Sequence, residues 1–537
     1  MYRWITEHKR KIFFTLLGGI ILSFCYIAGY QLDNYYTLDL MEKTLYLQLL
    51  LGTVGFSVVL YGLWTLVGRY GERLCAQPQI QFKLPYGVCV LFFFLCSLPA
   101  WLSLFPGGFA YDALGEWEQF KNQMITSHHP VIHVCVVGGL LEFFHDLTGS
   151  YNVGIAVYTF CQMVIMANIF AIALRIMKKL HFPGIFQWIA FLFWGFSPVI
   201  QLFSISVTKD VVFTGMELLF FLYVLWFYRD RADFFQKPGR LVAFCVVALC
   251  TMILRNNGLY IVAIMLIYML FGSRQYWKRF GLMLFGILVA YGLYVGPFYS
   301  ALDVEAGGIE EMLSVPLQQM ARVHRYDYES LSQEDLELLY QVVPKENLDL
   351  YRSTVSDFVK SGFQKEAFDA NKGEFIKLWI KWGLEHPLTY VNSFLINTVD
   401  FWYPGAVVDG YMHANDRSSY FDYQVDEPGT EIVLLPKVHE FYEAISHDAA
   451  AQKVPFAFLV LSPGWYLIVS LVIFLYLWYQ RSYRLMQPMF ILVLSVLTVL
   501  LGPVALVRYV LILYYAFPVV LGMFLCHGEI GIADEGK

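Results

Sequence analysis

Apolar segments long enough to cross a lipid bilayer recur along the whole chain, separated by short polar connections. A spanning helix needs about 20 mostly apolar residues, and the core helices of a large bundle can be somewhat shorter. About twelve segments fit this description, and the two beside Arg255 are the shortest: 11–30, 45–67, 86–105, 152–174, 184–203, 211–228, 240–254, 258–272, 280–300, 456–479, 486–503 and 507–526. The pattern predicts an all-α polytopic membrane protein with about 12 transmembrane helices.

The basic residues predict the orientation of these spans, because cytoplasmic loops retain Lys and Arg. With both termini in the cytoplasm, six basic clusters fall on the cytoplasmic side: His8/Lys9/Arg10/Lys11, Arg69/Arg73/Lys83, Arg175/Lys178/Lys179, Arg229/Arg231/Lys237/Arg240, Arg274/Lys278/Arg279 and Arg481/Arg484. This agreement requires that the apolar segment 131–148 does not cross the membrane. It contains His133, Glu142, His145 and Asp146, so we expect an interfacial helix on the outer surface.

The same orientation divides the chain into three parts. Residues 1–300 form a transmembrane bundle with an outer loop at 106–151, residues 301–454 lie outside the membrane, and residues 455–537 add the last transmembrane helices. In the outer segment the spacing predicts an amphipathic helix that starts near Pro316 and an aromatic-rich helix pair at 375–405, broken at Pro387. Its apolar residues gather near its ends, so we expect a mostly helical lid packed on the bundle.

The composition agrees with a membrane protein and argues against soluble and nucleic-acid-binding proteins. Hydrophobic residues make up 58% of the chain and charged residues 15%, and the mean hydropathy of +0.54 is outside the range of soluble domains. A net charge of -6 gives no basic surface for nucleic acid. The segment 301–454 has no cysteine, so a disulfide framework outside the membrane is not expected.

The first outer loop carries a polar face beside the apolar spans. On a helix, Asp112, Glu116, Gln119 and Gln123 would lie on one side. Ionisable groups at the edge of a bilayer are costly and indicate a functional site. Carboxylates one turn apart can act as a general base and as a metal or hydrogen-bond anchor. The alternative is that Asp112 only caps the start of a helix.

Three histidines follow in the same loop, at His128, His129 and His133. A neutral imidazole can accept a proton or bind a metal, and a protonated one can hold a phosphate. We expect His129 and His133 to contact a phosphate. The alternative is that they are amphipathic anchors at the interface, with an apolar ring and a polar tip.

Three cations lie at outer ends of the predicted spans, namely Lys209, Arg255 and Arg508. A lysine meets a phosphate as a point charge, and a guanidinium can bind it through two parallel hydrogen bonds. Charge so close to hydrocarbon is rare without a partner, so we expect all three to bind an anionic donor. The alternative for Lys209 is a snorkelling side chain paired with the adjacent Asp210.

Polar and aromatic residues of the outer segment are candidates for an acceptor groove, because sugars bind aromatic faces with amides alongside. They are Gln318, Gln319, His324, Trp402 and Tyr403. Interfacial aromatic residues are more often membrane anchors, and that alternative stays open.

The order of these elements resembles a known family. An acidic residue after a turn, a polar helix, an H-P element and an apolar interfacial helix are similar to the first luminal loop of GT-C glycosyltransferases, including protein O-mannosyltransferases and the aminoarabinose transferases of lipid A. The KD, RNNG, SVPLQQ and WYP elements also resemble bacterial GT-C-related membrane proteins of unassigned function. The resemblance implies that Asp112 is the catalytic or metal-binding carboxylate. The mannosyltransferase element H-P-P-L-G-K has the counterpart H-H-P-V-I-H at 128–133.

These features predict a glycosyltransferase of the bacterial cytoplasmic (inner) membrane. It would transfer a sugar from a polyprenyl-phosphate donor to a cell-envelope acceptor on the outer face, with Asp112 and Glu116 as catalytic carboxylates and inversion at the sugar. Two carboxylates near a phosphate are compatible with Mg²⁺ or Mn²⁺ at Asp112, although nothing in the sequence requires a metal. The alternative is a non-enzymatic transporter or flippase of a lipid-linked saccharide, which should carry charges in the middle of its spans.

Overall fold

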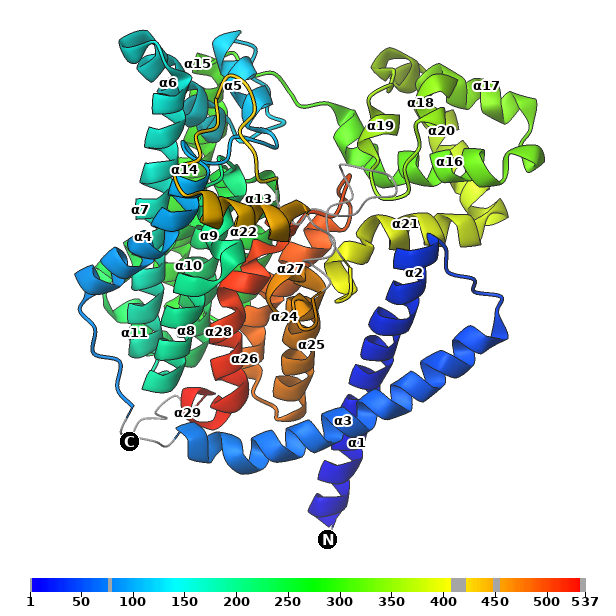
Figure 1. The fold of residues 1–537 in the computed structure, drawn as a ribbon. Helices are drawn as coiled ribbons and strands as arrows, with labels where there is room; N and C mark the ends of the chain where they lie inside the picture. Colours follow the sequence, from blue (N-terminus) through cyan, green and yellow to red (C-terminus); the bar gives the residue numbers. More distant parts are fainter. Residues whose placement is uncertain (1, 76–79, 407–421, 448–453, 532–537) are drawn as a thin grey trace.

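The protein is an all-α membrane protein, as its hydrophobic pattern predicts (Figure 1). The computed structural model describes residues 2–75, 80–406, 422–447 and 454–531. Every regular element in these ranges is a helix, and isolated β-bridges join some of the loops.

Eight helical stretches of the described residues are long and apolar enough to cross a membrane, and a bent pair would make a ninth. The first is Glu7–Tyr35, which combines α1 (Tyr2–Ser23), η1 (Phe24–Ala28) and α2 (Gly29–Tyr35). Five are single helices: α3 (Lys43–Cys75), α4 (Tyr86–Ser103), α6 (Val131–Thr148), α7 (Tyr151–Lys179) and α10 (Lys209–Arg229). The last two are Arg274–Ala301, which contains α14 (Trp277–Leu293) and α15 (Tyr299–Ala301), and η7 (Val507–Val510) with α28 (Leu511–Leu525). The bent pair is α8 (Gly184–Phe196) with α9 (Pro198–Ser204), which meet at 56°. Seven of the eight and the bent pair coincide with predicted spans.

The other four predicted spans are also helical but shorter. They are α12 (Pro238–Leu254), α13 (Asn256–Phe271), α25 (Pro463–Tyr479) and the run Tyr483–Val499, which contains α26 (Tyr483–Met486) and α27 (Phe490–Val499). None reaches the 18 residues of the shortest full-length candidate. All twelve segments are therefore helices, and a total of twelve membrane crossings stays a prediction.

Helix α6 is the segment that the charge pattern assigns to the membrane surface. By length and apolarity alone it could also cross a membrane. It packs against α7 and against α5 (Ala113–Lys121), and Figure 1 shows it at the same end of the bundle as α5 and α15. Its interfacial position stays a prediction.

Helices α10 and α28 form the buried centre of the bundle. Most of each helix is enclosed by protein, and the two pack against one another and against neighbouring helices such as α7 and α8. Lys209 and Asp210 open α10, and Arg508 lies just before α28. The ion pair between Asp210 and Arg508 shows that both helices begin at the same end of the bundle.

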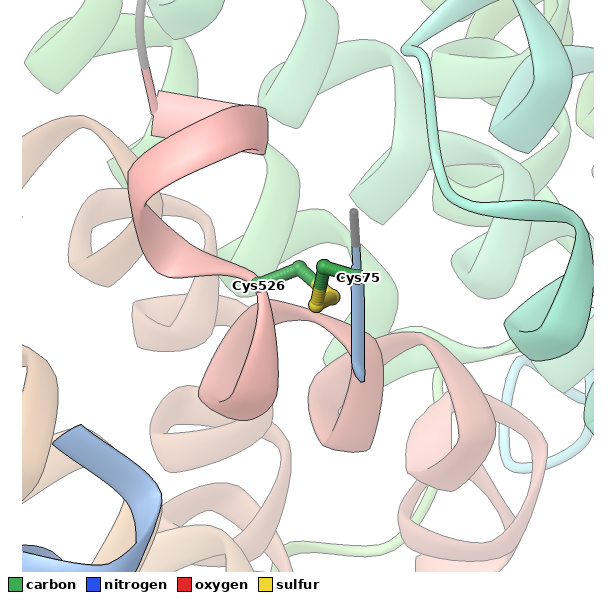
Figure 2. The surroundings of a disulfide bond; sticks show 2 residues. All are labelled: Cys75 and Cys526. Carbon is green, nitrogen blue, oxygen red and sulfur yellow. A yellow bond between two sulfur atoms is a disulfide. The ribbon is translucent and has the colours of Figure 1, made fainter. Parts of the chain in front are cut away.

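The opposite end of α28 carries a disulfide that the sequence did not predict. Helix α3 packs across α1 and ends beside the end of α28, where Cys75 is bonded to Cys526 (Figure 2). The two cysteines are 451 residues apart in sequence. The sequence predicted no disulfide framework in the outer segment 301–454, and this bond lies outside that segment.

The outer segment has a hydrophobic core of its own, so its apolar residues do not serve only to pack on the bundle. Its helices are α16 (Ser314–Tyr326), α17 (Gln333–Val342), α18 (Lys345–Asp349), α19 (Asp357–Lys360), α20 (Lys365–Glu385), α21 (Pro387–Trp402) and α22 (Pro436–His447). Buried side chains such as Leu317, Leu339 and Trp382 join α16, α17 and α20 into one cluster. Helices α20 and α21 are the predicted pair that breaks at Pro387, and α21 packs on α2 and α25 (Figure 1).

Candidate active site

A cavity of about 890 Å³ lies where the first outer loop, the beginnings of α10, α13 and α28, and the outer segment meet. The charged residues of the first outer loop and the bundle that line it are Asp112, Lys209, Arg255 and Arg508. Its charged lining from the outer segment is Glu310, Glu311, Asp357, Lys360, Lys365, Asp422 and Asp426. With His129, which also lines it, five of the predicted site residues from distant parts of the sequence therefore share one cavity.

The turn before α5 fixes where this loop points. Gly107 has φ +114°, and a Cβ there would lie 2.8 Å from the carbonyl oxygen of Ile205, so only glycine fits. The hydroxyl of Thr159 on α7 donates to the Pro106 carbonyl at 2.7 Å. The backbone of Gly108 pairs with the loop before α10, through bonds to Ile205 and from Val207. These contacts set Asp112 beside the first residue of α10.

The structure decides between the two interpretations of Asp112. Asp112 occupies the N-cap position of α5, but its side chain makes no capping hydrogen bond. Its Oδ2 instead accepts hydrogen bonds from Lys209 Nζ at 2.5 Å and Arg508 Nη1 at 2.9 Å. The second Arg508 nitrogen lies 3.4 Å from Asp112 Oδ1, which makes this guanidinium contact bidentate. Asp112 is thus an ion-pair partner and not a helix cap.

Glu116 lies one turn further along α5 and is enclosed by the protein. Its Oε1 is 3.3 Å from Lys209 Nζ, and its Oε2 is hydrogen-bonded to His133 Nδ1. The side chain of Glu116 is 1% exposed, whereas that of Asp112 is 31% exposed. Of this pair, Asp112 lines the cavity, whereas Glu116 contacts Lys209 from behind it, and a catalytic role for Glu116 stays a prediction.

The predicted polar face of α5 does not extend as far as expected. Gln119 faces back into its own loop, where its Oε1 accepts from the Thr126 backbone at 3.1 Å. Helix α5 ends at Lys121, and Gln123 follows it with φ 56°. The i+11 member of the pattern therefore lies beyond the helix.

Asp210 joins the two arginines. Its carboxylate is completely buried and lies 2.8 Å from Arg255 Nη1 and 3.4 Å from Arg508 Nη1. The alternative in which Lys209 pairs with Asp210 is wrong, because the two side chains turn to different partners. Thr208 caps α10 by accepting from the Asp210 backbone, which fixes the direction in which both leave the helix.

Together these groups form an unbroken series of alternating charges, which we call the charge network: Glu116, Lys209, Asp112, Arg508, Asp210 and Arg255. Three carboxylates balance three cations, as buried charges require. The ring of Tyr509 lies against both guanidinium groups, 4.5 Å from that of Arg255 and 4.9 Å from that of Arg508.

The network shifts the pKa values of the loop residues. Burial alone would raise the pKa of Asp112, but the charges of Arg508 and Lys209 hold it well below its usual value. Burial acts in the same direction on Glu116, and the charges of His133 and Lys209 reverse it, lowering the pKa of Glu116 to about 2. Both carboxylates are ionised at neutral pH.

The histidines separate into two environments. His129 lines the cavity, and its Nδ1 lies 3.1 Å from Lys209 Nζ. Burial and the charge of Lys209 lower the pKa of His129 to about 4, so it is neutral at pH 7 and accepts a hydrogen bond from the ammonium. His133 lies behind Glu116, where its Nε2 contacts the Tyr158 hydroxyl at 2.7 Å. It is not part of the cavity lining, and its contact with a phosphate stays a prediction.

None of the five predicted acceptor residues lines the cavity. Gln318 donates to the Arg352 carbonyl, Gln319 accepts from Trp379, and His324 contacts Tyr340, all within the outer segment. Trp402 stacks on Phe24, and Tyr403 packs against Gly29. Their side chains pack within the segment and against the bundle, and an acceptor contact at these residues stays a prediction.

Several residues around the cavity escaped prediction. The sequence identified Asp210 only as a neighbour of Lys209, and it did not single out Tyr509. Lys360 reaches the cavity from α19 and pairs with Glu311 at 2.7 Å. No local pattern identifies Lys360 and Glu311, because they come close to the charge network only through the folding of the outer segment.

Asp112, Glu116 and His129 are also a possible metal-ligating group, since their ligand atoms lie within 4.8 Å of one another. The Lys209 ammonium, however, is within 3.3 Å of an atom of each of them. A divalent ion between these ligands would meet that positive charge, so the predicted metal does not fit the site as it stands.

The chain belongs to a family whose description is "Family of unknown function (DUF6020)", and the family model matches residues 116–535. The match includes Glu116, Lys209, Asp210, Arg255 and Arg508 and begins just after Asp112. Searches of curated proteins and of solved structures found no match.

Replacing Asp210 by Asn tests how far the network stabilises the fold. It should lower the free energy of unfolding by about 3–5 kcal/mol, because two buried guanidinium groups lose their shared counter-charge. Thermal unfolding of the detergent-purified protein measures this. Asp230→Asn, an exposed carboxylate at the other end of α10, is the control and should change stability little. Equal stability of the two variants would contradict the network.

The pH dependence of stability tests the environment of His129. Its folded pKa of about 4 lies below the usual 6.5, so the unfolded chain binds the proton more readily. Stability from this residue is complete above pH 6.5 and is lost as the pH falls toward 4, by about 1–3 kcal/mol. His129→Asn should remove this part of the pH dependence in denaturation curves. A constant difference between wild type and variant across that window would refute the assignment.

Proposed function

We propose that the protein is a membrane glycosyltransferase that takes a sugar from a polyprenyl-phosphate donor and transfers it to a hydroxyl of a cell-envelope acceptor. The observation that carries this proposal is the position of Asp112. It is the one network carboxylate with substantial exposure, and it lies in the cavity beside Lys209, Arg255 and Arg508. A carboxylate next to a cluster of cations provides a proton acceptor and a phosphate site within one cavity.

In this reaction the acceptor oxygen attacks the anomeric carbon as the bond from that carbon to the donor phosphate oxygen breaks. Asp112 accepts the acceptor's proton, and the electron pair of the broken bond leaves with the polyprenyl phosphate. Lys209, Arg255 and Arg508 stabilise the charge on that phosphate. Attack opposite the leaving group inverts the sugar configuration.

Anion binding is supported by the helix ends that meet at the cavity. The N-terminal ends of α10 and α13 contribute Lys209, Asn256 and Asn257 to its lining, and a helix N-terminus favours negative charge. Arg255 Nη1 has its ion-pair contact with Asp210 but no well-aligned hydrogen bond. Arg255 also lines the cavity, where its guanidinium can meet a phosphate oxygen.

The balanced network implies an exchange of partners when the donor binds. In the free protein the cations are neutralised by carboxylates, and a strongly paired Asp112 is a weak base. A donor phosphate that takes contacts from Arg508 and Lys209 would leave Asp112 less paired, which raises the pKa of its carboxyl. The same event then positions the donor and strengthens the base.

An apolar groove gives a place for the lipid part of the donor. It has a volume of about 160 Å³ and is lined by residues of α25, α27 and α28. Val496 and Leu497 of α27 line this groove, whereas Thr498 and Val499 line the cavity. Consecutive residues of α27 thus line the proposed phosphate site and an apolar surface that suits part of an isoprenoid chain.

The resemblance of the first loop to GT-C enzymes supports the same reaction, and Asp112 is the position that matches their loop carboxylate. It also supports a bacterial inner-membrane location with the cavity on the outer face. The acidic side chains Glu310, Asp422 and Asp426 on the outer wall suit the hydroxyl groups of a carbohydrate acceptor.

A carrier of lipid-linked saccharides is the second candidate, and Glu217 is the observation that favours it. This carboxylate lies in the middle of α10, is buried, and accepts a hydrogen bond from Ser495. Ionisable groups at membrane depth often mark transport pathways. The sequence prediction placed charges at outer ends and overlooked this one. Glu217 is a single group away from the cavity lining, so we favour the enzyme.

Replacing Asp112 by Asn separates the two candidates. The variant should transfer sugar about 10²–10⁴-fold more slowly, because a carboxamide cannot accept the proton. The measurement is consumption of a polyprenyl-phosphate sugar by purified protein in detergent, where no compartments exist for transport. Glu118→Gln, an exposed residue of the same helix, should retain full activity. Full activity of Asp112→Asn would contradict the mechanism, and no consumption by the wild type would favour a carrier.

A further inference from the structure

Three potential metal ligands converge beside the cavity. Asp112 and Glu116 come from successive turns at the start of α5, and His129 comes from the end of the same loop. The His129 Nδ1 lies 3.6 Å from Glu116 Oε1, and ligand atoms of all three residues lie within 4.8 Å of one another. Two carboxylates and one imidazole suit divalent ions such as Mn²⁺ or Zn²⁺.

The ammonium of Lys209 lies among these ligands. Its Nζ is 2.5 Å from Asp112, 3.3 Å from Glu116 and 3.1 Å from His129 Nδ1. An ammonium has three N–H groups and no acceptor, so its three donors correspond to three acceptors. Each ligand atom that would bind a metal therefore already faces a positive charge.

The backbone of α10 holds this ammonium in place. Lys209 is 8% exposed, and it opens a helix capped by Thr208. The adjacent Asp210 is fixed by Arg255 and Arg508, which keeps the first turn of α10 from rotating. The lysine side chain thus extends from a fixed origin into the centre of the three ligands.

We propose that the Lys209 ammonium takes the cation position of this site. The native protein binds no divalent metal between Asp112, Glu116 and His129, and these three residues become a divalent-metal site once the ammonium is removed. This inference concerns the side chains alone and does not depend on the proposed function. The second metal-like group, Glu142, His145 and Asp146, is more exposed and contributes nothing to the cavity lining.

Removal of the ammonium leaves space and negative charge together. In Lys209→Ala, Glu116 keeps only its histidine partners and Asp112 keeps Arg508. A divalent ion restores the lost positive charge and can be reached from the cavity, which Asp112 and His129 line. Lys209→Met also removes the charge but retains a side chain of similar length, so it should leave no room for an ion.

The experiment measures Mn²⁺ binding directly. Wild type, His129→Ala, Lys209→Ala, Lys209→Met and the double variant Lys209→Ala/His129→Ala are purified in detergent, treated with chelator and titrated with Mn²⁺. Loss of the free-ion electron paramagnetic resonance signal reports binding, and thermal unfolding reports stabilisation. We expect one Mn²⁺ per chain and a raised unfolding temperature in Lys209→Ala only. The double variant should bind at least about tenfold more weakly, because a ligand is lost.

Two results would overturn the proposal. The first is a folded Lys209→Ala that binds Mn²⁺ no better than Lys209→Met does. The second is one Mn²⁺ bound by the wild type and lost in His129→Ala, which decides the question even if Lys209→Ala does not fold. Sugar transfer is not measured in either arm, so failure here is distinct from failure of the proposed function.

Discussion

Ion pairing among six buried or half-buried groups is the constraint on which the cavity end of this bundle depends. Each carboxylate of the charge network faces at least one cation, and each cation except Arg255 contacts two carboxylates. Charges removed from water are tolerated only when they are paired. The series therefore joins the first outer loop to α10, α13 and the start of α28, four parts of the chain that are far apart in sequence.

The same pairing shapes the chemistry that the cavity can perform. A neutral network lets cations stand at helix N-termini, where they would otherwise be unfavourable. It also keeps the exposed carboxylate ionised but weakly basic until another anion takes its partners. In the proposed reaction, phosphate binding and the base strength of Asp112 are linked through Lys209 and Arg508. The lysine ammonium also stands between the potential metal ligands, which is the basis of our proposal that a side chain takes the place of a divalent ion.

The spans and the position of the site could be predicted from sequence because both depend on one-dimensional patterns. Hydrophobic length identified the helices, and the cost of charge near hydrocarbon singled out Asp112, Lys209, Arg255 and Arg508. The ion-pair partners of these charged residues could not be predicted in the same way. Lys209 and Asp210 are neighbours in sequence, but their side chains leave the helix toward different partners, and only the folded loop shows which.

Other contacts also depend on three-dimensional packing that the sequence does not show. His133 looked like a phosphate ligand because it follows two histidines, but α6 turns it behind Glu116 and toward Tyr158. Gln318 and Gln319 looked like acceptor contacts because amides bind sugars, but backbone and side-chain groups of the outer segment already bind them. The Cys75–Cys526 bond joins elements that no local pattern relates.

The most direct test of the central claim is the structure of the protein determined with a polyprenyl phosphate bound. The account predicts phosphate density in the cavity within hydrogen-bond distance of Arg255 and Arg508, with Arg508 turned from Asp112 and the lipid chain following α27 into the apolar groove. A phosphate bound elsewhere, with the contacts of Asp112 to Lys209 and Arg508 unchanged, would contradict it.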